Sequence, residues 1–294
     1  QTFASPTTNK IINDLVTKFP NIEHIILDTV PSSYAVESFK DAYGFEGLVD
    51  YDFSKSDFIV SVDADFLGDW QGGGYDTKYV SNRVPDRKNR KGRMSKHVQF
   101  ESNMTLTGAN ADIRVPATPT EQKKILSYIY SEVKGLNSKT KLSREQKENA
   151  KFAADGIKKF GSKAVIVSGL DDKNVQDLIL DLNNHIRSLA IEKSARLTRT
   201  QSGNQVDVFI KELLDGKISG LITVGLNPVY SLSEGEKIKK AISDLDFSLS
   251  FSMKEDETSS VCKYIAAAPH YLESWGDYEF KEGQYFLAQP TIRP

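Results

Sequence analysis

Apolar residues recur along the first half of the chain in two kinds of pattern. Ile11, Leu15 and Phe19 are spaced four residues apart, which predicts an amphipathic helix. Short apolar runs without this spacing predict strands instead. By these criteria the first half contains helices over 7–19, 34–44 and 120–134, and strands over 24–28, 58–62 and 97–101.

The second half repeats this alternation. Helices are expected over 143–160, 173–188, 206–214 and 234–243, and strands over 163–169, 220–225, 247–253 and 264–268. Strands and helices that alternate at this spacing are typical of doubly wound parallel sheets joined by right-handed crossovers. A polar, unpatterned stretch over 135–141 separates the two halves. We therefore expect an α/β fold of two Rossmann-like lobes, residues 1–138 and 139–294.

Composition narrows the class of protein. Of the 294 residues, 39% are hydrophobic and 27% are charged, as in ordinary globular proteins. A net charge of -2 gives no positive field that would attract nucleic acid. The sequence has no apolar run of about 18 residues, so no direct membrane span is expected. Gln1 at the start and the unpatterned residues 291–294 lead us to expect a piece of a longer protein. Cys262 is the only cysteine, so no iron-sulfur cluster is expected in this piece.

Residues 71–95 interrupt the pattern. This segment begins with Gly72-Gly73-Gly74 and runs into a basic stretch over 83–96. Connections of this length are uncommon unless they cover a site, meet a partner or are disordered. We interpret the segment as a long loop, which is either a solvated insertion or a docking surface.

Candidate site residues follow the predicted strands, because ligands of open α/β sheets bind beyond the carboxyl ends of the strands. The candidates are Asp28 and residues 63–65, 101–102, 225–228 and 254–258. Gly225-Leu226-Asn227-Pro228 is the most suggestive stretch. Its glycine lets a phosphate approach the backbone, and its asparagine can donate hydrogen bonds. A turn without any ligand is the alternative interpretation.

Other constellations give weaker signals. Asp63, Asp65 and Asp69 have the composition of a magnesium site, but strand-end aspartates commonly cap the next helix. The histidines show no paired ligand spacing and Cys262 has no histidine pattern nearby, so packing roles are expected for them. No Gly-x-Ser-x-Gly, Walker A or Gly-x-Gly-x-x-Gly element occurs. The sequence therefore predicts neither a metal site nor a catalytic residue.

Several stretches resemble molybdopterin oxidoreductases of the formate dehydrogenase and dimethyl sulfoxide reductase type, over most of the chain. Residues 56–65 resemble the strand that in this family ends in a pterin-contacting Gly-x-Asn turn, and residues 105–116 are similar to the stretch after the next strand. Gly225-Leu226-Asn227-Pro228 matches the family's Gly-x-Asn-Pro turn, and Glu257-Thr258 begins its downstream series. The resemblance implies that Gly225, Asn227, Pro228 and Thr258 descend from a cofactor site.

Within this family, the likeness is to the large iron-sulfur subunit of alternative complex III, a bacterial respiratory quinol oxidoreductase. Asp63-Ala64-Asp65-Phe66-Leu67-Gly68, residues 106–112 and residues 289–294 carry this likeness. The resemblance implies a downstream ferredoxin-like domain with iron-sulfur clusters and membrane subunits as partners. It also implies electron transport on the periplasmic side of the bacterial inner membrane.

One departure from the family pattern bears on activity. Where the family's first turn offers Gly and Asn, this chain has Asp63 and Asp65, two carboxylates that would repel a pyrophosphate. We therefore expect a non-catalytic scaffold domain in which molybdopterin is lost. Two alternatives stay open. The chain could be a fragment of an active bis-pterin molybdenum or tungsten oxidoreductase, with Gly225, Asn227 and Thr258 lining a guanine-dinucleotide groove, or a simple nucleotide-binding module.

Overall fold

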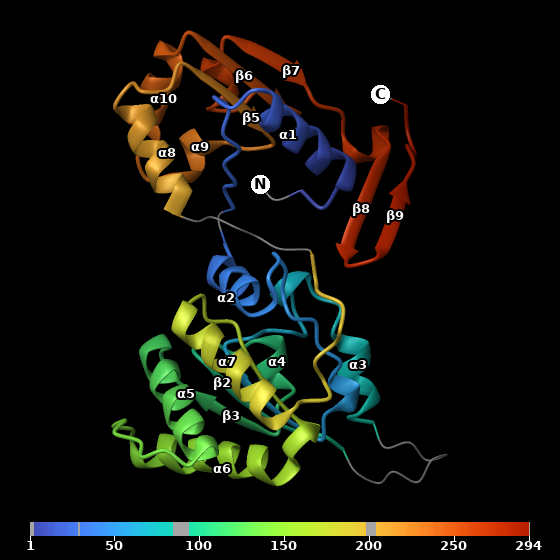
Figure 1. Cartoon of the computed structure of the whole chain (residues 1–294), viewed down its shortest axis with the longest axis vertical. Coiled ribbons are helices and arrows are strands. Elements are labelled where there is room, and N and C mark those ends of the chain that lie inside the picture. Colours follow the sequence, from blue (N-terminus) through green and yellow to red (C-terminus); the bar gives the residue numbers. More distant parts are fainter. Residues whose placement is uncertain (1–2, 29, 85–93, 198–203, 294) are drawn as a thin grey trace. The chain divides into compact units, whose positions relative to one another are not determined.

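The chain folds into two compact units that do not coincide with the predicted lobes. The computed structural model describes residues 3–28, 30–84, 94–197 and 204–293 (Figure 1). Unit 1 combines residues 1–33 with 200–294, and unit 2 comprises residues 34–199. The predicted domain boundary at 138 does not separate the two units. The strand Ala164–Ser168 lies after this position but pairs with Phe58–Val62 in the first sheet.

Unit 2 is built on a parallel sheet of four strands. Its elements are α2 (Ser33–Tyr43), η1 (Phe53–Lys55), β1 (Phe58–Val62), η2 (Trp70–Gly72), α3 (Asp76–Ser81), β2 (Lys96–Glu101), α4 (Leu106–Ala109), β3 (Ile113–Pro116), α5 (Pro119–Lys134), α6 (Arg144–Phe160), η3 (Gly161–Lys163), β4 (Ala164–Ser168) and α7 (Lys173–Ile186). The strand order is β3-β2-β1-β4, and Val60 of β1 pairs with Val98 of β2 and Ile166 of β4. Strands β1 and β4 are buried throughout, which explains why their sequences are continuous apolar runs.

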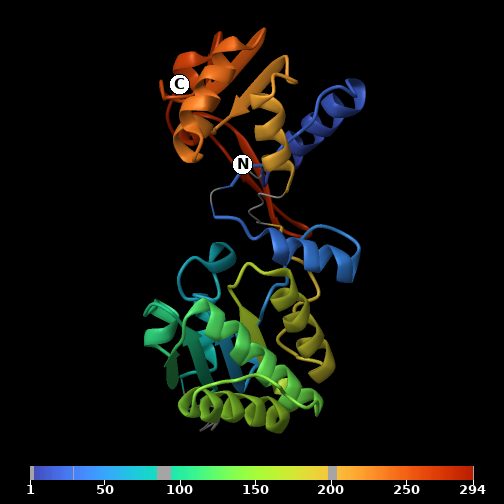
Figure 2. The same ribbon diagram turned by 90° about the vertical axis from the view of Figure 1, so that its left-hand side faces the viewer.

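Helices cover one face of the unit 2 sheet. The buried core on this face unites Phe58 and Val62 of β1 with Leu126 of α5, Ile157 of α6 and Ile179 of α7. Helices α5 and α6, in green in Figures 1 and 2, lie side by side along this face. The four-residue spacing that predicted these helices from the sequence thus corresponds to their buried stripes.

An aromatic layer covers the other face of the unit 2 sheet. Ile59 of β1 and Val165 of β4 share a buried core there with Phe53, Phe66 and Tyr79. The rings of Phe53 and Phe66 stack with centroids 4.4 Å apart. These rings come from η1, from the segment after β1 and from α3, so a sequence search for helical stripes does not reveal this layer.

Unit 1 contains a second parallel sheet and a hairpin. Its elements are α1 (Pro6–Lys18), α8 (Asn204–Leu214), β5 (Gly220–Val224), α9 (Pro228–Ser231), α10 (Gly235–Asp244), β6 (Phe247–Ser252), η4 (Ser259–Val261), β7 (Tyr264–Ala267), η5 (Tyr271–Glu273), β8 (Gly276–Lys281) and β9 (Gln284–Ala288). The sheet order is β5-β6-β7, and Leu213 of α8 and Ile238 of α10 belong to the core on one of its faces. Parallel sheets with helices in both units confirm the predicted Rossmann-like α/β fold.

Some predictions of local structure are wrong. Residues 24–28 form no strand in the part of the chain that the structure describes, because an apolar run becomes a strand only beside a hydrogen-bonding neighbour. The segment 71–95 is not one long loop, since it contains part of η2 and all of α3, while its residues 85–93 lie outside the described residues. The hairpin of β8 and β9 was not predicted, and its turn is made by Gly283 with a φ of 79°.

Candidate functional site

Gly225, Asn227 and Pro228 form a turn where β5 of unit 1 ends. Gly225 has a φ of 62°, a left-handed conformation that glycine adopts without the steric penalty of a Cβ atom. Its N–H donates a hydrogen bond to the carbonyl of Phe251 at 3.1 Å. Pro228 is the first residue of α9, where a missing N–H costs nothing. Turn geometry alone therefore accounts for the residue types at these positions.

The structure brings Asn227 together with Thr258. Asn227 Oδ1 accepts hydrogen bonds from the Thr258 hydroxyl at 2.7 Å and from the Thr258 N–H at 3.2 Å. Thr258 is fully buried, and its Oγ1 also accepts a hydrogen bond from the N–H of Val229 at 3.1 Å. The two residues that the family resemblance singled out in unit 1 are thus partners of each other.

Glu257 completes this cluster with a negative charge. Its Oε2 accepts a hydrogen bond from Asn227 Nδ2 at 2.6 Å, and this hydrogen bond lowers the pKa of the Glu257 carboxyl. The carboxylate is therefore ionised at neutral pH. Both ends of the Asn227 amide are engaged within the chain, and an anionic group approaching the turn would meet a carboxylate.

Asp63 lies at the end of β1 in unit 2 in a conformation that few non-glycine residues adopt. Its φ is 58°, its N–H donates to the carbonyl of Phe100 at 2.8 Å, and its Oδ1 accepts from Gln122 Nε2 at 3.2 Å. Gly169 follows the neighbouring strand β4, and a Cβ atom added there would lie 2.0 Å from the carbonyl oxygen of Asp63. The chain itself therefore fills the space between the carboxyl ends of β1 and β4.

The carboxylate of Asp65 is held by hydrogen bonds from another segment of unit 2. Its Oδ1 accepts hydrogen bonds from the N–H of Thr107 at 3.0 Å and from the Thr107 hydroxyl at 2.7 Å. The Thr107 hydroxyl oxygen in turn accepts from the N–H of Leu67 at 2.9 Å. Asp65 thus ties the segment after β1 to α4, which is a structural role. No group of His, Cys, Asp and Glu among the described residues could hold a metal ion.

Sequence reasoning missed a buried polar ladder along β2. His97 Nε2 lies 3.2 Å from Gln99 Oε1, and Gln99 Nε2 donates to Glu101 Oε2 at 3.2 Å. All three side chains are fully buried, and His97 Nδ1 also lies 3.1 Å from the Tyr79 hydroxyl. Arg114 Nε donates to Glu101 Oε1 at 2.5 Å. Polar residues at every second position of an otherwise apolar strand were the available signal.

The charges of these buried groups follow from their surroundings. Burial lowers the pKa of His97 to about 4, so its ring is neutral at pH 7. Hydrogen bonds from Thr105 and Arg114 outweigh the effect of burial on Glu101 and hold the pKa of its carboxyl below the usual range. The ladder thus joins a neutral imidazole to a carboxylate through an amide.

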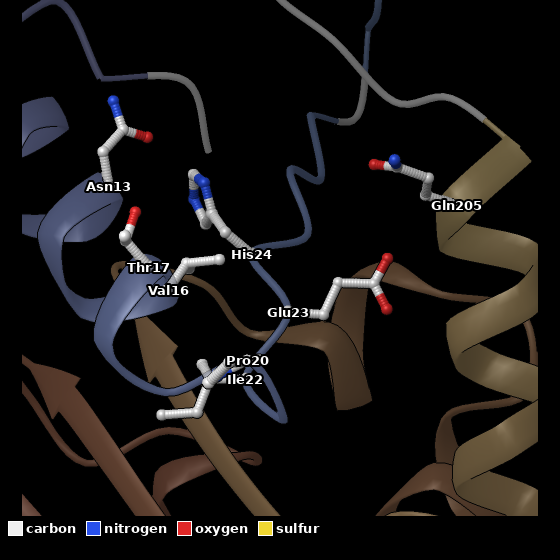
Figure 3. Close-up of a pocket in the computed structure, with 8 residues that line it drawn as sticks. All are labelled: Asn13, Val16, Thr17, Pro20, Ile22, Glu23, His24 and Gln205. Carbon is white, nitrogen blue, oxygen red and sulfur yellow. The ribbon is translucent and has the colours of Figure 1, made fainter.

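Unit 1 also contains a pocket of about 510 Å³ that none of the predicted site residues lines. The lining residues come from α1, from the segment after it and from α8, and are Asn13, Val16, Thr17, Pro20, Ile22, Glu23, His24 and Gln205 (Figure 3). Burial lowers the pKa of His24. The walls mix apolar and polar side chains, and no cluster of charged groups gathers there that would select a phosphate.

The residues at the two strand-end turns do not fit a dinucleotide cofactor. Phosphate sites on α/β folds supply free backbone N–H groups, positive charge or both. Here the turn of unit 1 carries Glu257, and the corresponding edge of unit 2 carries Asp63 and Asp65. The side-chain amide of Asn227 and the hydroxyl of Thr258 are already hydrogen-bonded within the chain.

Comparisons with known proteins relate this chain to others through its fold. No protein-family model matches the chain, and no curated protein matches it. Acetylene hydratase from Pelobacter acetylenicus is similar with a TM-score of 0.59 at 12% identity, over 88% of this chain and 47% of that chain. This chain therefore spans about half the length of that enzyme.

A second similar structure is the formyltransferase/hydrolase complex from Methylorubrum extorquens in complex with methylofuran. The TM-score is 0.54 at 13% identity, over 92% of this chain and 79% of that chain. Identities this low establish similarity of fold alone. Both likenesses agree with the α/β fold of the two units.

Proposed function

We propose that this chain is a molybdopterin-oxidoreductase-like domain that serves as a non-catalytic scaffold. One observation carries the proposal: the side chains at both strand-end turns bind each other. Asn227 is held by Thr258 and Glu257 in unit 1, and Asp65 is held by Thr107 in unit 2. A site whose polar groups are already paired must lose those hydrogen bonds before it can bind a ligand.

Electrostatics support the same proposal. A bound dinucleotide would place its phosphates near the carboxylate of Glu257 in unit 1, or near Asp63 and Asp65 in unit 2. Like charges at such distances oppose binding, most strongly where water is excluded. These carboxylates would have to be removed or neutralised for a phosphate-bearing cofactor to bind tightly.

We propose a respiratory setting for this scaffold, on the strength of the sequence resemblance alone. In that setting the chain belongs to the large iron-sulfur subunit of a quinol oxidoreductase of the alternative complex III kind. A ferredoxin-like domain that holds the iron-sulfur clusters follows it, and membrane subunits are its partners on the periplasmic side of the bacterial inner membrane. In the described residues no helix is long and apolar enough to cross a membrane, so such partners would provide the attachment.

Metal analysis of the full-length natural protein tests this function. Purified protein should contain iron and no stoichiometric molybdenum or tungsten, because the clusters lie outside this chain and the pterin site is lost. Iron that a mild chelator removes without changing the visible absorbance of the clusters is counted as adventitious. Molybdenum or tungsten at one atom per chain would contradict the scaffold proposal.

A second candidate is a fragment of an active bis-pterin molybdenum or tungsten oxidoreductase. The observation that favours it is the exposed Gly225, whose positive φ opens the backbone at the end of β5 beside Asn227. Both similar structures are also enzymes, acetylene hydratase and the formyltransferase/hydrolase complex. The candidates differ in whether a guanine nucleotide binds at Asn227 and Thr258. A simple nucleotide-binding module would behave like the second candidate in this respect.

A further inference from the structure

One face of the unit 1 sheet carries a continuous apolar surface that is largely exposed in the described part of the chain. The pairing places Ile222 beside Leu249, Val224 beside Phe251, and Leu249 beside Tyr264, so these side chains point to the same side of the sheet. The exposed fractions are 47% for Ile222, 37% for Phe251 and 59% for Tyr264. We call this surface the bare face, made of Ile222, Val224, Phe247, Leu249, Phe251 and Tyr264.

The opposite face of the same sheet is covered. Thr223 of β5 and Ser248 and Ser250 of β6 point to that side and are buried. Leu213 of α8 and Ile238 of α10 belong to the core there. Parallel sheets are covered on both faces in nearly all known folds, and an exposed apolar patch of this kind marks a surface that packs against something else.

Helix α1 belongs to the same compact unit and also has an unburied apolar stripe. Ile11, Leu15 and Phe19 follow each other at four-residue intervals and are 62%, 38% and 44% exposed. No residue of α1 is buried. Such a helix lacks the tertiary packing from which helices in proteins obtain most of their stability.

Hydrogen bonds to Asp277 anchor the start of α1. The Ser5 hydroxyl donates to Asp277 Oδ1 at 2.5 Å, and the N–H of Thr7 donates to Asp277 Oδ2 at 3.0 Å. These contacts fix the first turn to β8. Beyond the helix, residues 22–28 have no regular structure, and Val16 and Ile22 line the pocket of Figure 3. The pocket therefore lies beside the second half of α1.

We propose that the bare face is the packing surface for α1, which turns about its anchor at Asp277 and lays Ile11, Leu15 and Phe19 on β5, β6 and β7. A single rearrangement then covers two apolar surfaces of the same unit. Tethering gives α1 an effective concentration that a separate partner reaches only at high levels. This inference is independent of the proposed function, because it concerns neither strand-end turn.

Disulfide trapping tests the proposal directly. In a Cys262→Ser background, Leu15→Cys is paired with Ile222→Cys in one variant and with Phe251→Cys in another. A disulfide forms only when the two Cβ atoms come within about 3.5–4.5 Å. Thr17→Cys with Ile222→Cys is the control, because Thr17 lies on the other side of α1. Oxidation is followed by mass spectrometry of the monomer fraction.

The proposal expects an intramolecular disulfide in at least one Leu15→Cys pair, formed at least tenfold faster than in the control pair. Equal rates, or disulfides found only between chains, would overturn it, and the latter result would assign the bare face to a second copy. A measurement without new cysteines guards against misfolded variants. Leu15→Asp should raise the fluorescence of a bound apolar dye severalfold over Thr17→Asp, and equal dye binding would also overturn the proposal.

Discussion

Asn227 and Thr258, which are far apart in the sequence, meet in unit 1 through a hydrogen bond of 2.7 Å between Oδ1 and the threonine hydroxyl. The family resemblance marks both residues as remnants of a cofactor site. In the structure they instead fix α9 to the start of η4, since the N–H of Val229 also donates to Thr258. In the structure these two residues therefore have a stabilising role.

Replacing Thr258 with valine should destabilise unit 1 by about 1–3 kcal/mol. Valine keeps the shape of the side chain but removes the hydroxyl hydrogen bond to Asn227 Oδ1 and leaves the N–H of Val229 without its acceptor. Urea denaturation followed by circular dichroism measures the change. Ser260→Ala is the control, because the exposed Ser260 hydroxyl donates a hydrogen bond to the carbonyl of Glu257 and its loss should cost less than about 0.5 kcal/mol. Equal shifts in the two variants would show that the Thr258 contacts contribute little.

Gly169→Ala should destabilise unit 2 by about 3 kcal/mol or more, because its new Cβ would overlap backbone rather than a movable side chain. The added atom would lie 2.0 Å from the carbonyl oxygen of Asp63. Gly220→Ala is the control, since a Cβ there would lie no closer than 3.6 Å to its neighbours. Thermal denaturation compares the two. A Gly169→Ala protein as stable as Gly220→Ala would contradict the close contact between the ends of β1 and β4.

Stability should fall as the pH is lowered from about 6.5 towards 4, and His97 should be the cause. Burial lowers the pKa of His97 to about 4 in the folded state, whereas a histidine in the unfolded chain has a pKa near 6.5. Between these values the unfolded state binds more protons, so stability rises with pH at up to about 1.4 kcal/mol per unit. Below about pH 4, His97 is protonated in both the folded and the unfolded state, so it no longer makes stability depend on pH.

The variant His97→Gln isolates this contribution, because glutamine does not titrate. Its stability should change less than that of the parent protein between pH 6.5 and 4, as measured by urea denaturation at each pH. Glu101 and Asp112, whose pKa values are lowered, lose their contributions at lower pH in both proteins. Parallel pH profiles would rule out a buried neutral His97 as the source of the dependence.

Local sequence patterns predicted most of the elements and the fold class. The apolar runs of β1, β4 and β5 were predicted correctly as strands. In β1 and β4 these runs reflect burial on both faces, because buried parallel strands have few polar residues. Helix α6 was also predicted, and in the structure Ser143 and Gln146 form a capping box before its apolar stripe. These features depend on neighbours within a few residues, which a sequence displays directly.

Long-range relationships could not be predicted in this way. Nothing near Ala164 indicates that β4 pairs with β1 instead of starting a second sheet. The partners of Asp65 and Asp63 are Thr107 and Gln122, both distant in the sequence, whereas the sequence suggested caps of the next helix or carboxylates that would repel a pyrophosphate. The prediction of a strand over 24–28 was wrong for the same reason. A strand depends on a neighbouring strand that its own sequence does not specify.

Titration calorimetry of this chain with guanosine diphosphate tests the central claim most directly. The account predicts no saturable heat at millimolar nucleotide, because Asn227 and Thr258 bind each other and Glu257 opposes phosphate. Asn227→Ala, which removes the side chain that would hold the nucleotide, should give the same trace. Saturable binding at micromolar nucleotide that Asn227→Ala abolishes would contradict the scaffold and establish a retained cofactor site.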